Sequence, residues 1–491
     1  MNKEMYHPSS KRKELIARTL TYSLMVLSII TLVVVSLFYT LGYRFDTKDK
    51  KLELSALVQF VTSPSGATVE IDGVTHSQIT PTKETVAAGS HEFVMWRDGY
   101  ETWRKTVTVQ SGTLTWLNYT RLVPKARPVE SVVTLPNLAQ SLASPDKRFM
   151  ATVPDATKPT LAFYNLSADK ITEATLSIPA EAYTDASTQD VTHHFEIDQW
   201  DQGSRYLLVK HVYGDKNEWL VVDRQDNKVV SNITRTFDTD ITSAYFGDNN
   251  ATVLYARIGD DIRKVNLANE TISAPLISHV AEFELYGDVI AYVLAPDKTT
   301  GKRVAGIVKD GEEPVELYRT SSLEQVPVHI RVTNYFNKDY AVISDGGNVQ
   351  VYSGTFPDAQ SERSRLKATN SFTFPSDIAW LQLSPSGRFV LAQNAASYAS
   401  YDLERAELSP VATLAGTTEP RVLKWLDDYY VWSDRSDMLT MREFDGANQH
   451  AINTVAAGFD IALSQNGRWL YSIGKRADGH LQLQRVRMIL P

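Results

Sequence analysis

The chain has 491 residues, about three times the length of an average domain, so we expect two or more folded units. Its content of 43% hydrophobic and 22% charged residues is typical of globular proteins and excludes a wholly disordered, collagen-like or polytopic membrane chain. The absence of cysteine excludes disulfides, thiolate catalysis and cysteine-ligated metal sites. The net charge of −8 argues against a broad basic surface, so we expect no nucleic-acid partner.

Residues 19–43 carry no charge and have an apolar centre from Leu24 to Phe38. A helix of this length spans about 37 Å, which is enough to cross a hydrocarbon core of about 30 Å. This predicts a single transmembrane helix over residues 19–43 rather than a buried core helix. A cleaved signal peptide is the other interpretation, but the span ends in Tyr39-Thr40-Leu41-Gly42-Tyr43, which does not fit a cleavage site of small residues.

The short segment before this helix is basic. Residues 1–18 contain five lysines or arginines and two glutamates, and such positive flanks stay in the cytoplasm. We therefore expect residues 1–18 to form a cytoplasmic tail of a single-pass protein of the cell membrane. Everything after residue 44 then lies outside the cytoplasm, and both a cell surface and a periplasm fit this orientation.

Residues 56–122 alternate β-branched or aromatic residues with polar residues, and turn residues divide them. Asp72-Gly73 lies between two extended runs, which is typical of a tight hairpin. The pattern predicts a compact antiparallel β-sandwich over residues 56–122. Residues 123–130 contain Pro124 and Pro128 without periodicity, which predicts an extended linker.

Five short motifs follow one another in the predicted sandwich: Pro64-Ser65-Gly66-Ala67, Val69-Glu70-Ile71-Asp72-Gly73, Thr80-Pro81, Gly89-Ser90-His91 and Gly99-Tyr100. Together they resemble the PEGA domain family, with Ser65 in place of the glutamate of the motif. The resemblance implies a non-enzymatic β-module that is common in surface proteins, with no catalytic residues to transfer. We expect His91 to be structural rather than a metal ligand.

Residues 131–491 repeat one pattern, a polar turn followed by an arginine, an aromatic residue and an apolar strand. Weaker copies begin at Asp201, Gly247, Tyr286, Phe336 and Leu426. Eight units average about 44 residues, the length of a four-stranded propeller blade. The three clearest copies are Ser144-Pro145-Asp146-Lys147-Arg148-Phe149-Met150, Ser384-Pro385-Ser386-Gly387-Arg388-Phe389-Val390 and Ser464-Gln465-Asn466-Gly467-Arg468-Trp469-Leu470.

These repeats resemble the TolB-like and WD-like β-propellers, in which a Ser-Pro-Asp-Gly turn opens a blade strand. The expected fold class is mainly β, with a transmembrane helix, a small PEGA-like sandwich and a propeller of about eight, alternatively seven, blades over residues 131–491. Two stacked β-sandwiches are the rival architecture. We expect the repeated arginines to hold turns and the repeated aromatic residues to pack between sheets: Arg148, Arg388, Arg468, Phe149, Phe389 and Trp469.

No zinc-protease, serine-hydrolase or nucleotide-binding motif occurs in the sequence. His193 and His194 are neighbours that point to opposite faces of a strand, so they cannot easily share a metal. Asp427-Asp428 and the Asp434/Asp437 pair do not match a calcium loop, and solvated turns explain them. We therefore predict no catalytic, cofactor-binding or metal-binding residue and no cofactor. Five glycosylation sequons are discounted because the layout is prokaryotic in character: Asn118, Asn165, Asn232, Asn250 and Asn269.

These features favour a membrane-anchored, extracytoplasmic binding or scaffold protein of the cell envelope. Its partner would be an envelope protein or polysaccharide, recognised without turnover by the loop-covered face of the propeller. Two alternatives remain: an envelope glycan hydrolase with a carboxylate pair on that face, and an envelope assembly or sensing factor. The sequence itself does not name the ligand or the face used.

Overall fold

The computed structural model describes residues 9–40, 43–46, 51–185, 191–226, 228–247, 251–320, 326–357, 366–414 and 421–491. Residues 1–8 of the predicted cytoplasmic tail and the sequon at Asn250 lie outside the described residues. The chain divides into two units, residues 1–126 and residues 127–491.

The first unit begins with helix α1 (Ser9–Thr40). Within it, residues Lys13–Phe38 are long and apolar enough to cross a membrane, and this stretch buries none of its surface against the rest of the protein. The helix ends three residues before the predicted Tyr43, because residues 43–46 pair as a strand with residues 51–54. The apolar helix fits a single-pass anchor or a signal sequence.

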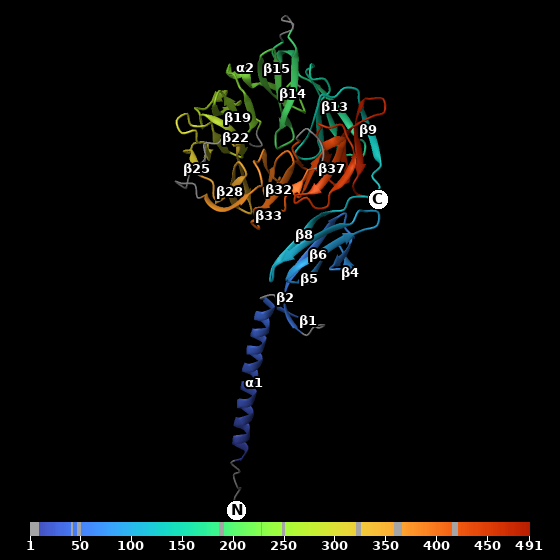
Figure 1. The fold of residues 1–491 in the computed structure, drawn as a ribbon, viewed down its shortest axis with the longest axis vertical. Coiled ribbons are helices and arrows are strands. Elements are labelled where there is room, and N and C mark those ends of the chain that lie inside the picture. The colour runs from blue at the N-terminus through green and yellow to red at the C-terminus, as the bar shows by residue number, and fades with distance from the viewer. Residues whose placement is uncertain are drawn as a thin grey trace, which may run out of the picture. The chain divides into compact units, whose positions relative to one another are not determined.

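Two four-stranded sheets follow the helix (Figure 1). The first contains β1 (Tyr43–Asp46), β2 (Lys51–Ser63), β5 (Thr82–Ala87) and β8 (Leu114–Arg121). The second contains β3 (Thr68–Ile71), β4 (Val74–Ile79), β6 (Gly89–Trp96) and β7 (Trp103–Val109). Their core buries Phe60, Phe93 and Trp103, and Asp72 and Gly73 both have positive φ in the predicted hairpin turn.

Two predictions for this unit are wrong in detail. The sandwich is not wholly antiparallel, because β2 and β8 pair in parallel. The chain passes through the second sheet between these strands, and such a long crossover permits parallel pairing. The predicted linker is also shorter than 123–130: Val123 accepts a hydrogen bond from Glu101, Lys125 donates one to Gly99, and a strand begins at Val129.

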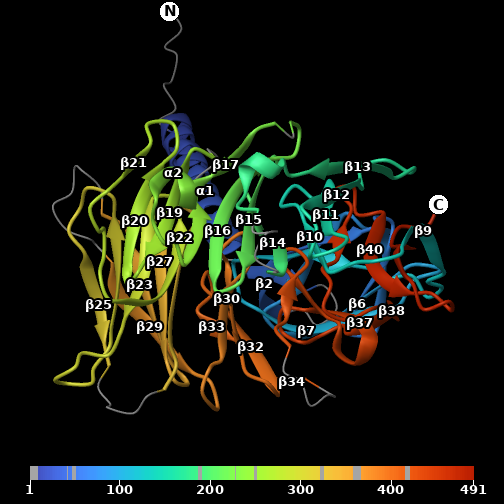
Figure 2. The same cartoon turned by 90° about the horizontal axis from the view of Figure 1, so that it is seen from above.

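The second unit consists of antiparallel sheets arranged in a ring (Figures 1 and 2). The described residues form eight such sheets, and in seven of them the strands pair in sequence order. The first sheet contains β10 (Gln140–Ala143), β11 (Phe149–Val153), β12 (Thr160–Asn165) and β13 (Thr172–Ser177), and the second contains β14 (His193–Trp200), β15 (Tyr206–Tyr213), β16 (Lys216–Asp223) and β17 (Val230–Asn232). The third sheet contains β18 (Ser243–Phe246), β19 (Val253–Ile258), β20 (Asp261–Asn266) and β21 (Thr271–Ile272), and the fourth contains β22 (Val280–Tyr286), β23 (Val289–Leu294), β24 (Val304–Lys309) and β25 (Val315–Arg319).

The remaining sheets continue the same pattern, with one short extra strand beside β32. The fifth sheet contains β26 (Val328–Tyr335), β27 (Lys338–Asp345), β28 (Asn348–Gly354) and β29 (Lys367–Thr373), and the sixth contains β30 (Trp380–Leu383), β31 (Phe389–Gln393), β32 (Ser397–Asp402), β33 (Glu407–Leu408) and β34 (Ala412–Thr413). The seventh sheet contains β35 (Lys424–Trp425), β36 (Tyr430–Ser433), β37 (Met438–Glu443) and β38 (His450–Thr454), and the last contains β39 (Ala462–Leu463), β40 (Trp469–Lys475), β41 (Leu481–Arg487) and β9 (Val129–Leu135). Helix α2 (Ile233–Phe237) and short 3-10 turns at Ala180–Ala182 and Arg435–Asp437 complete the unit.

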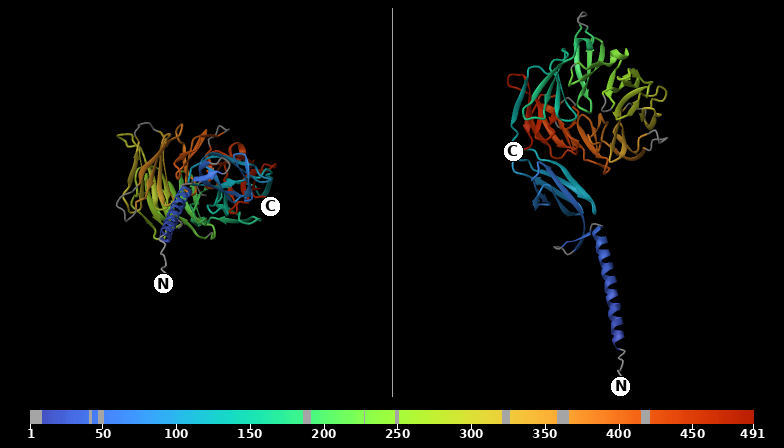
Figure 3. Two further views of the ribbon diagram at one scale, coloured as in Figure 1. Left: turned by 90° about the horizontal axis from the view of Figure 1, so that it is seen from below. Right: turned by 180° about the vertical axis from the view of Figure 1, so that it is seen from behind.

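The last sheet closes the ring, because its outer strand β9 comes from the start of the unit and pairs with β41 (Figure 3). The hydrophobic clusters lie between consecutive sheets, and one of them joins the last sheet to the first. Strand β26 contacts both β22 and β30, and each of the three is the first strand in its sheet. The first strands labelled in Figure 1, β14 and β22, lie on the inner side of the ring, so we call β22, β26 and β30 inner strands. This architecture is a β-propeller, which confirms the predicted fold class.

Candidate functional site

The repeated turns of the sequence join the first and second strands of their sheets. In the three clearest copies a buried serine hydroxyl accepts a hydrogen bond from the backbone N–H five residues later. The oxygen–nitrogen distances are 2.9 Å from Ser144 to Phe149, 3.1 Å from Ser384 to Phe389 and 2.9 Å from Ser464 to Trp469. This shared geometry confirms that the motif residues form turns. The weaker copy at Gly247 lies partly outside the described residues.

Several of these turns border a cavity of about 520 Å³ at the ends of β10, β35 and β39, which we call the turn cavity. Its wall combines tryptophan, proline and leucine with lysine and aspartate, a mixture suited to a ligand that has both apolar and polar groups. The lining residues are Leu142, Ala143, Ser144, Pro145, Lys147, Pro385, Lys424, Trp425, Leu426, Asp427, Asp428, Trp432, Asp460, Ile461, Ala462 and Leu463.

The aspartates in this wall hold the turns together. Asp460 accepts a hydrogen bond from the backbone N–H of Ala143 at 3.0 Å, which links the last sheet to the first. Asp428 accepts one from the N–H of Ser386 at 2.5 Å, and Asp427 accepts from two backbone N–H groups within its own turn. These contacts confirm that Asp427-Asp428 belongs to a turn, and they show what its carboxylates do there.

Two lysines and a tryptophan complete the polar character of the cavity. The Lys424 ammonium lies 3.4 Å from Asp460 and 5.3 Å from the ring centre of Trp432. Lys147 makes no ion pair within the described chain. Trp425 packs against a hydrophobic cluster with Leu423 and also lines the cavity, and its buried indole N–H has no acceptor among the described residues.

A second cleft, of about 360 Å³, lies where the inner strands β22, β26 and β30 run side by side, and we call it the inner-strand cleft. Arg331 contacts two carboxylates there, Glu282 at 2.6 Å and Glu284 at 3.4 Å. The ring of His329 lies 2.8 Å from the other carboxylate oxygen of Glu282. The cleft therefore brings together two acids, which stand two residues apart on one strand, and a shared cation.

The pKa values of the two glutamates in this cleft are shifted in opposite directions. Partial burial between the inner strands raises the pKa of Glu284 to about 7; Arg331 opposes this rise, and the charge of Glu282 adds to it. Burial also opposes ionisation of Glu282, but the hydrogen bond from His329 and the charge of Arg331 lower its pKa overall. At neutral pH one acid is therefore ionised while the other titrates, a division that acid–base catalysis uses and that ion-pair networks also produce.

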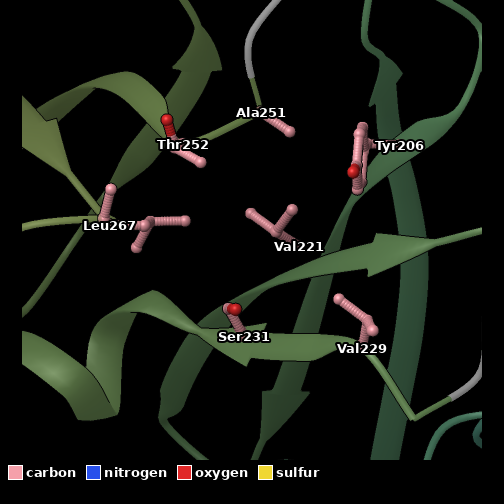
Figure 4. Close-up of a pocket in the computed structure, with 8 residues that line it drawn as sticks. Tyr206, Val221, Val229, Ser231, Ala251, Thr252 and Leu267 are labelled. Carbon is pink, nitrogen blue, oxygen red and sulfur yellow. The ribbon is translucent and has the colours of Figure 1, made fainter.

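A third cavity, of about 390 Å³, lies between the second and third sheets and is lined mainly by apolar residues. Figure 4 draws its lining residues as sticks, which come from the second sheet and the neighbouring third sheet with their loops. None of its lining residues carries a charge, so it offers little to orient a polar ligand. They are Tyr206, Val221, Val229, Ser231, Ala251, Thr252, Leu267 and Ala268.

The repeated arginines do not all have the same role. Arg388 binds the Asp402 carboxylate through Nε at 3.2 Å and a terminal nitrogen at 2.7 Å, so it holds its blade as expected. The guanidinium of Arg148 lies beside the ring of Phe149, and Arg468 is exposed without an ion pair in the described chain. The weaker copy at Arg205 repeats the bidentate contact, here with Asp223.

The repeated aromatic residues pack as expected. Phe389 stacks on Phe444 of the next sheet with 4.1 Å between ring centres. Arg224 of the second sheet lies 3.8 Å from the ring centre of Phe149 in the first, and Trp469 belongs to the cluster that joins the last sheet to the first. The sequence patterns thus identified the turns and their packing, but not the cavity that the turns enclose.

The isolated histidines also have structural surroundings. His91 lies between the Asp72 carboxylate at 2.5 Å and the carbonyl of Ala87 at 2.9 Å. Its hydrogen bond is the main cause of the lowered pKa of Asp72. His193 contacts His211 while His194 is exposed, so the two neighbours point to opposite faces as predicted. No cluster of three metal-ligating side chains occurs among the described residues.

Comparison with known proteins identifies the first folded region. The family model of the PEGA domain matches residues 57–124. The chain thus combines a PEGA domain with a β-propeller, as the motifs predicted. No curated protein matches its sequence.

Solved propellers resemble the second unit at low sequence identity. The C-terminal WD40 domain of Sif2 is 12% identical with a TM-score of 0.45, covering 74% of this chain and 99% of that chain. The Cps50 (Swd1) propeller of Myceliophteria thermophila is 14% identical with a TM-score of 0.40, covering 67% and 100%. An oligogalacturonate lyase in complex with manganese is 10% identical with a TM-score of 0.40, covering 74% and 99%. None of these similarities indicates a ligand or an activity for this chain.

Proposed function

We propose that this protein is a membrane-anchored, extracytoplasmic binding protein of the cell envelope that holds its partner in the turn cavity without chemical turnover. The apolar helix supports the anchor, since residues 13–38 suffice to span a bilayer. The basic tail supports an orientation with the N-terminus in the cytoplasm. The PEGA domain then stands between the membrane anchor and the propeller in the sequence.

The turn cavity is the observation that carries the binding role. It is large enough for a small ligand or for one projecting group of a polymer, and it combines Trp425 with charged side chains. Its aspartates brace the backbone and are therefore committed to structure. A cavity with a rigid wall binds without reorganising, which reduces the entropic cost of association.

The test is retention of the full-length protein in detergent on isolated envelope fractions, with protein and polysaccharide separated. We expect saturable retention that Trp425→Ala weakens at least tenfold. Trp116→Ala is the matched control, because Trp116 is an exposed tryptophan of the PEGA domain, 45% accessible to solvent. Equal retention of the wild type and the Trp425→Ala variant, with both folded by thermal unfolding, would exclude the turn cavity as the binding site.

The second candidate function is envelope glycan hydrolysis, which the inner-strand cleft favours because Glu282 and Glu284 contact one arginine there. Such hydrolases need a pair of carboxyl groups, one protonated and one ionised. Release of soluble reducing sugar from envelope polysaccharide, lost in Glu284→Gln, would place this function first. Retention of polysaccharide without sugar release favours the binding protein, and retention by a protein alone favours an assembly or sensing factor.

A further inference from the structure

The PEGA domain is joined to the apolar helix by a short segment, which decides which end of the domain lies near the helix. Helix α1 ends at Thr40, and Tyr43 pairs with Leu54 near the start of β2. Three extended residues reach at most about 10 Å, and paired strand residues lie about 5 Å apart, so Leu54 stays within about 15 Å of the helix end. We call this end of the domain the anchor end.

Two loops lie at the anchor end, and neither carries a charge. Ser55 of β2 pairs with Ala87 at the end of β5 and accepts a hydrogen bond from the N–H of Gly112 at 3.0 Å, in the turn before β8. The sequence around these loops, residues 85–90 and residues 106–120, contains no charged side chain. By contrast, the turn between β6 and β7 at the opposite end contains an arginine, an aspartate and a glutamate. The anchor end can therefore enter a headgroup layer without desolvating a charge.

The strand that follows the second loop exposes two large apolar side chains. Leu114 and Trp116 of β8 are exposed while the residues after each of them are buried, so both point away from the core of the domain. Leu57 and Gln59 of β2 lie directly beside them, and the exposed Lys83 of β5 is the partner of Gln59 on the other side. Tryptophan and lysine beside aliphatic residues are typical of the interface between membrane and water.

The position of this face favours lipid as its partner. Leu57, beside Leu114, lies two residues beyond Ser55 along β2, which is about 7 Å. The headgroup layer on each side of a hydrocarbon core is about 5–8 Å thick, so a tilt of the domain brings Leu114 into it. A protein partner would need an interface of about 1,200–2,000 Å², which two exposed side chains do not supply. A small apolar face suffices for lipid, because the anchor makes the contact intramolecular.

We propose that the anchor end of the PEGA domain docks on the lipid headgroup layer of the membrane, with Leu114 and Trp116 among the headgroups and Lys83 near the lipid phosphates. This inference goes beyond the proposed binding role and rests on the proposed anchor. A docked PEGA domain is a fixed base on the membrane rather than a free spacer. Detergent removes the bilayer and with it this contact, so Trp116→Ala remains a control for retention in the turn cavity.

Single fluorophores test the docking, because the natural chain contains no cysteine. Ala88→Cys carries the fluorophore on an exposed loop residue at the anchor end. Ile79→Cys carries it at the opposite end, where Ile79 pairs with Thr68 and Thr68 pairs with Trp96. Each full-length protein is placed in vesicles of phosphatidylcholine and phosphatidylglycerol, with and without a nitroxide quencher on the lipid headgroup. We expect quenching at position 88 to be at least twofold stronger than at position 79.

A double variant separates docking from mere attachment to the helix. Leu114→Ser with Trp116→Ser, made in the Ala88→Cys protein, should reduce the quenching at least twofold. Its melting temperature should match that of the parent, because both side chains are exposed. Trp96→Ser is the matched control and should leave the quenching unchanged, since Trp96 is 39% exposed against 45% for Trp116 but lies at the opposite end of the domain.

Equal quenching at positions 88 and 79 would overturn the inference. Undiminished quenching in the double variant would also overturn it, because attachment to the helix alone would then hold the loop near the lipid. The proposed anchor is judged separately, by flotation of the protein with the vesicles after a carbonate wash. A protein that floats without the expected quenching refutes docking alone, whereas one that does not float refutes the anchor and the inference together.

Discussion

At the scale of single residues, the second sheet contains a buried hydrogen-bonded chain that the sequence does not reveal. His211 and Glu218 are 0% and 2% exposed, and their side chains approach to 2.8 Å. His193 approaches the other ring nitrogen of His211 at 2.8 Å. Because the Glu218 carboxylate accepts, Nδ1 of His211 donates to it, and Nε2 of His211 is left for the contact with Nδ1 of His193. These residues stand apart in the sequence, and only the strand register brings them together.

Glu218 should make the propeller less stable in acid. Burial opposes its ionisation, but hydrogen bonds from His211, Thr184 and Asn232 lower its pKa to about 2. A lowered pKa in the folded state gives stability that is present above the ordinary pKa near 4.5 and lost as the pH falls toward 2. Glu218→Gln replaces one acceptor oxygen with a donor and should lower the unfolding free energy by about 2–3 kcal/mol at pH 7.

Urea denaturation of the full-length protein between pH 7 and pH 3 measures this effect. The difference between Glu218→Gln and the wild type should shrink as the pH falls below about 4.5, because the carboxylate of the unfolded wild type becomes protonated there while that of the folded protein stays ionised until about pH 2. Glu407→Gln serves as control, since Glu407 is exposed on the short strand β33. A difference that stays constant from pH 7 to pH 3 would show that ionisation of Glu218 does not stabilise the fold.

Arg388 and Arg468 occupy the same repeat position but should differ in their contribution to stability. Arg388 makes a bidentate contact with Asp402 and a further one with Glu404 at 2.9 Å, with 15% of its side chain exposed. Arg388→Ala should therefore lower the unfolding free energy by about 1–3 kcal/mol. Arg468→Ala should change it by less than about 0.5 kcal/mol, because that side chain is exposed. Equal losses in the two variants would contradict this assignment.

At the scale of elements, local chemistry predicted the strands and turns, and long-range pairing did not follow from it. Glycine predicted the turns at Gly387 and Gly467, and both residues have a positive φ in the structure. Phe389 predicted the start of an apolar strand, and β31 begins at this residue. The pairing of β9 with β41 joins residues from opposite ends of the unit, so no local pattern reports it. The turn cavity was missed for the same reason, since its wall combines residues 142–147 with residues 424–463.

The closing pair β9–β41 should limit the stability of the ring. Thr134 and Gln482 are directly opposite partners in this pair, and neither is buried. Because the natural chain has no cysteine, Thr134→Cys with Gln482→Cys can form only one disulfide within a chain. Closing such a long loop should raise the unfolding free energy of the oxidised variant by about 2–5 kcal/mol.

The measurement is urea denaturation of this double variant before and after reduction, with Thr134→Cys alone as control. Reduction should return the midpoint of the double variant to that of the single variant. If oxidation leaves the midpoint unchanged while the disulfide is shown to have formed, opening of β9 from β41 does not precede unfolding.

At the scale of the whole molecule, one long uncharged apolar stretch distinguishes the predicted membrane anchor from the folded regions. The described residues have one helix apolar enough to span a bilayer, and the PEGA domain and the propeller follow it in the chain. Hydropathy predicts such a helix well because length and lack of charge decide it. Its orientation rests on the few basic residues before it, since the flank after Arg44 is also basic but carries compensating acidic residues.

Single-cysteine labelling tests the anchor and its orientation together, because the natural chain contains no thiol. In intact cells a membrane-impermeant maleimide should label Ser167→Cys, which is exposed in the propeller. Ser10→Cys, in the predicted cytoplasmic tail, should be labelled only after the membrane is permeabilised. Labelling of Ser10→Cys in intact cells would reverse the orientation and place the propeller in the cytoplasm. The labelled Ser167→Cys protein is then tested for cleavage by its mass and by release from membranes in a carbonate wash. If it lacks residues 1–43 and is released, those residues are a cleaved signal sequence. The same pair of variants therefore decides between an anchor and a signal sequence.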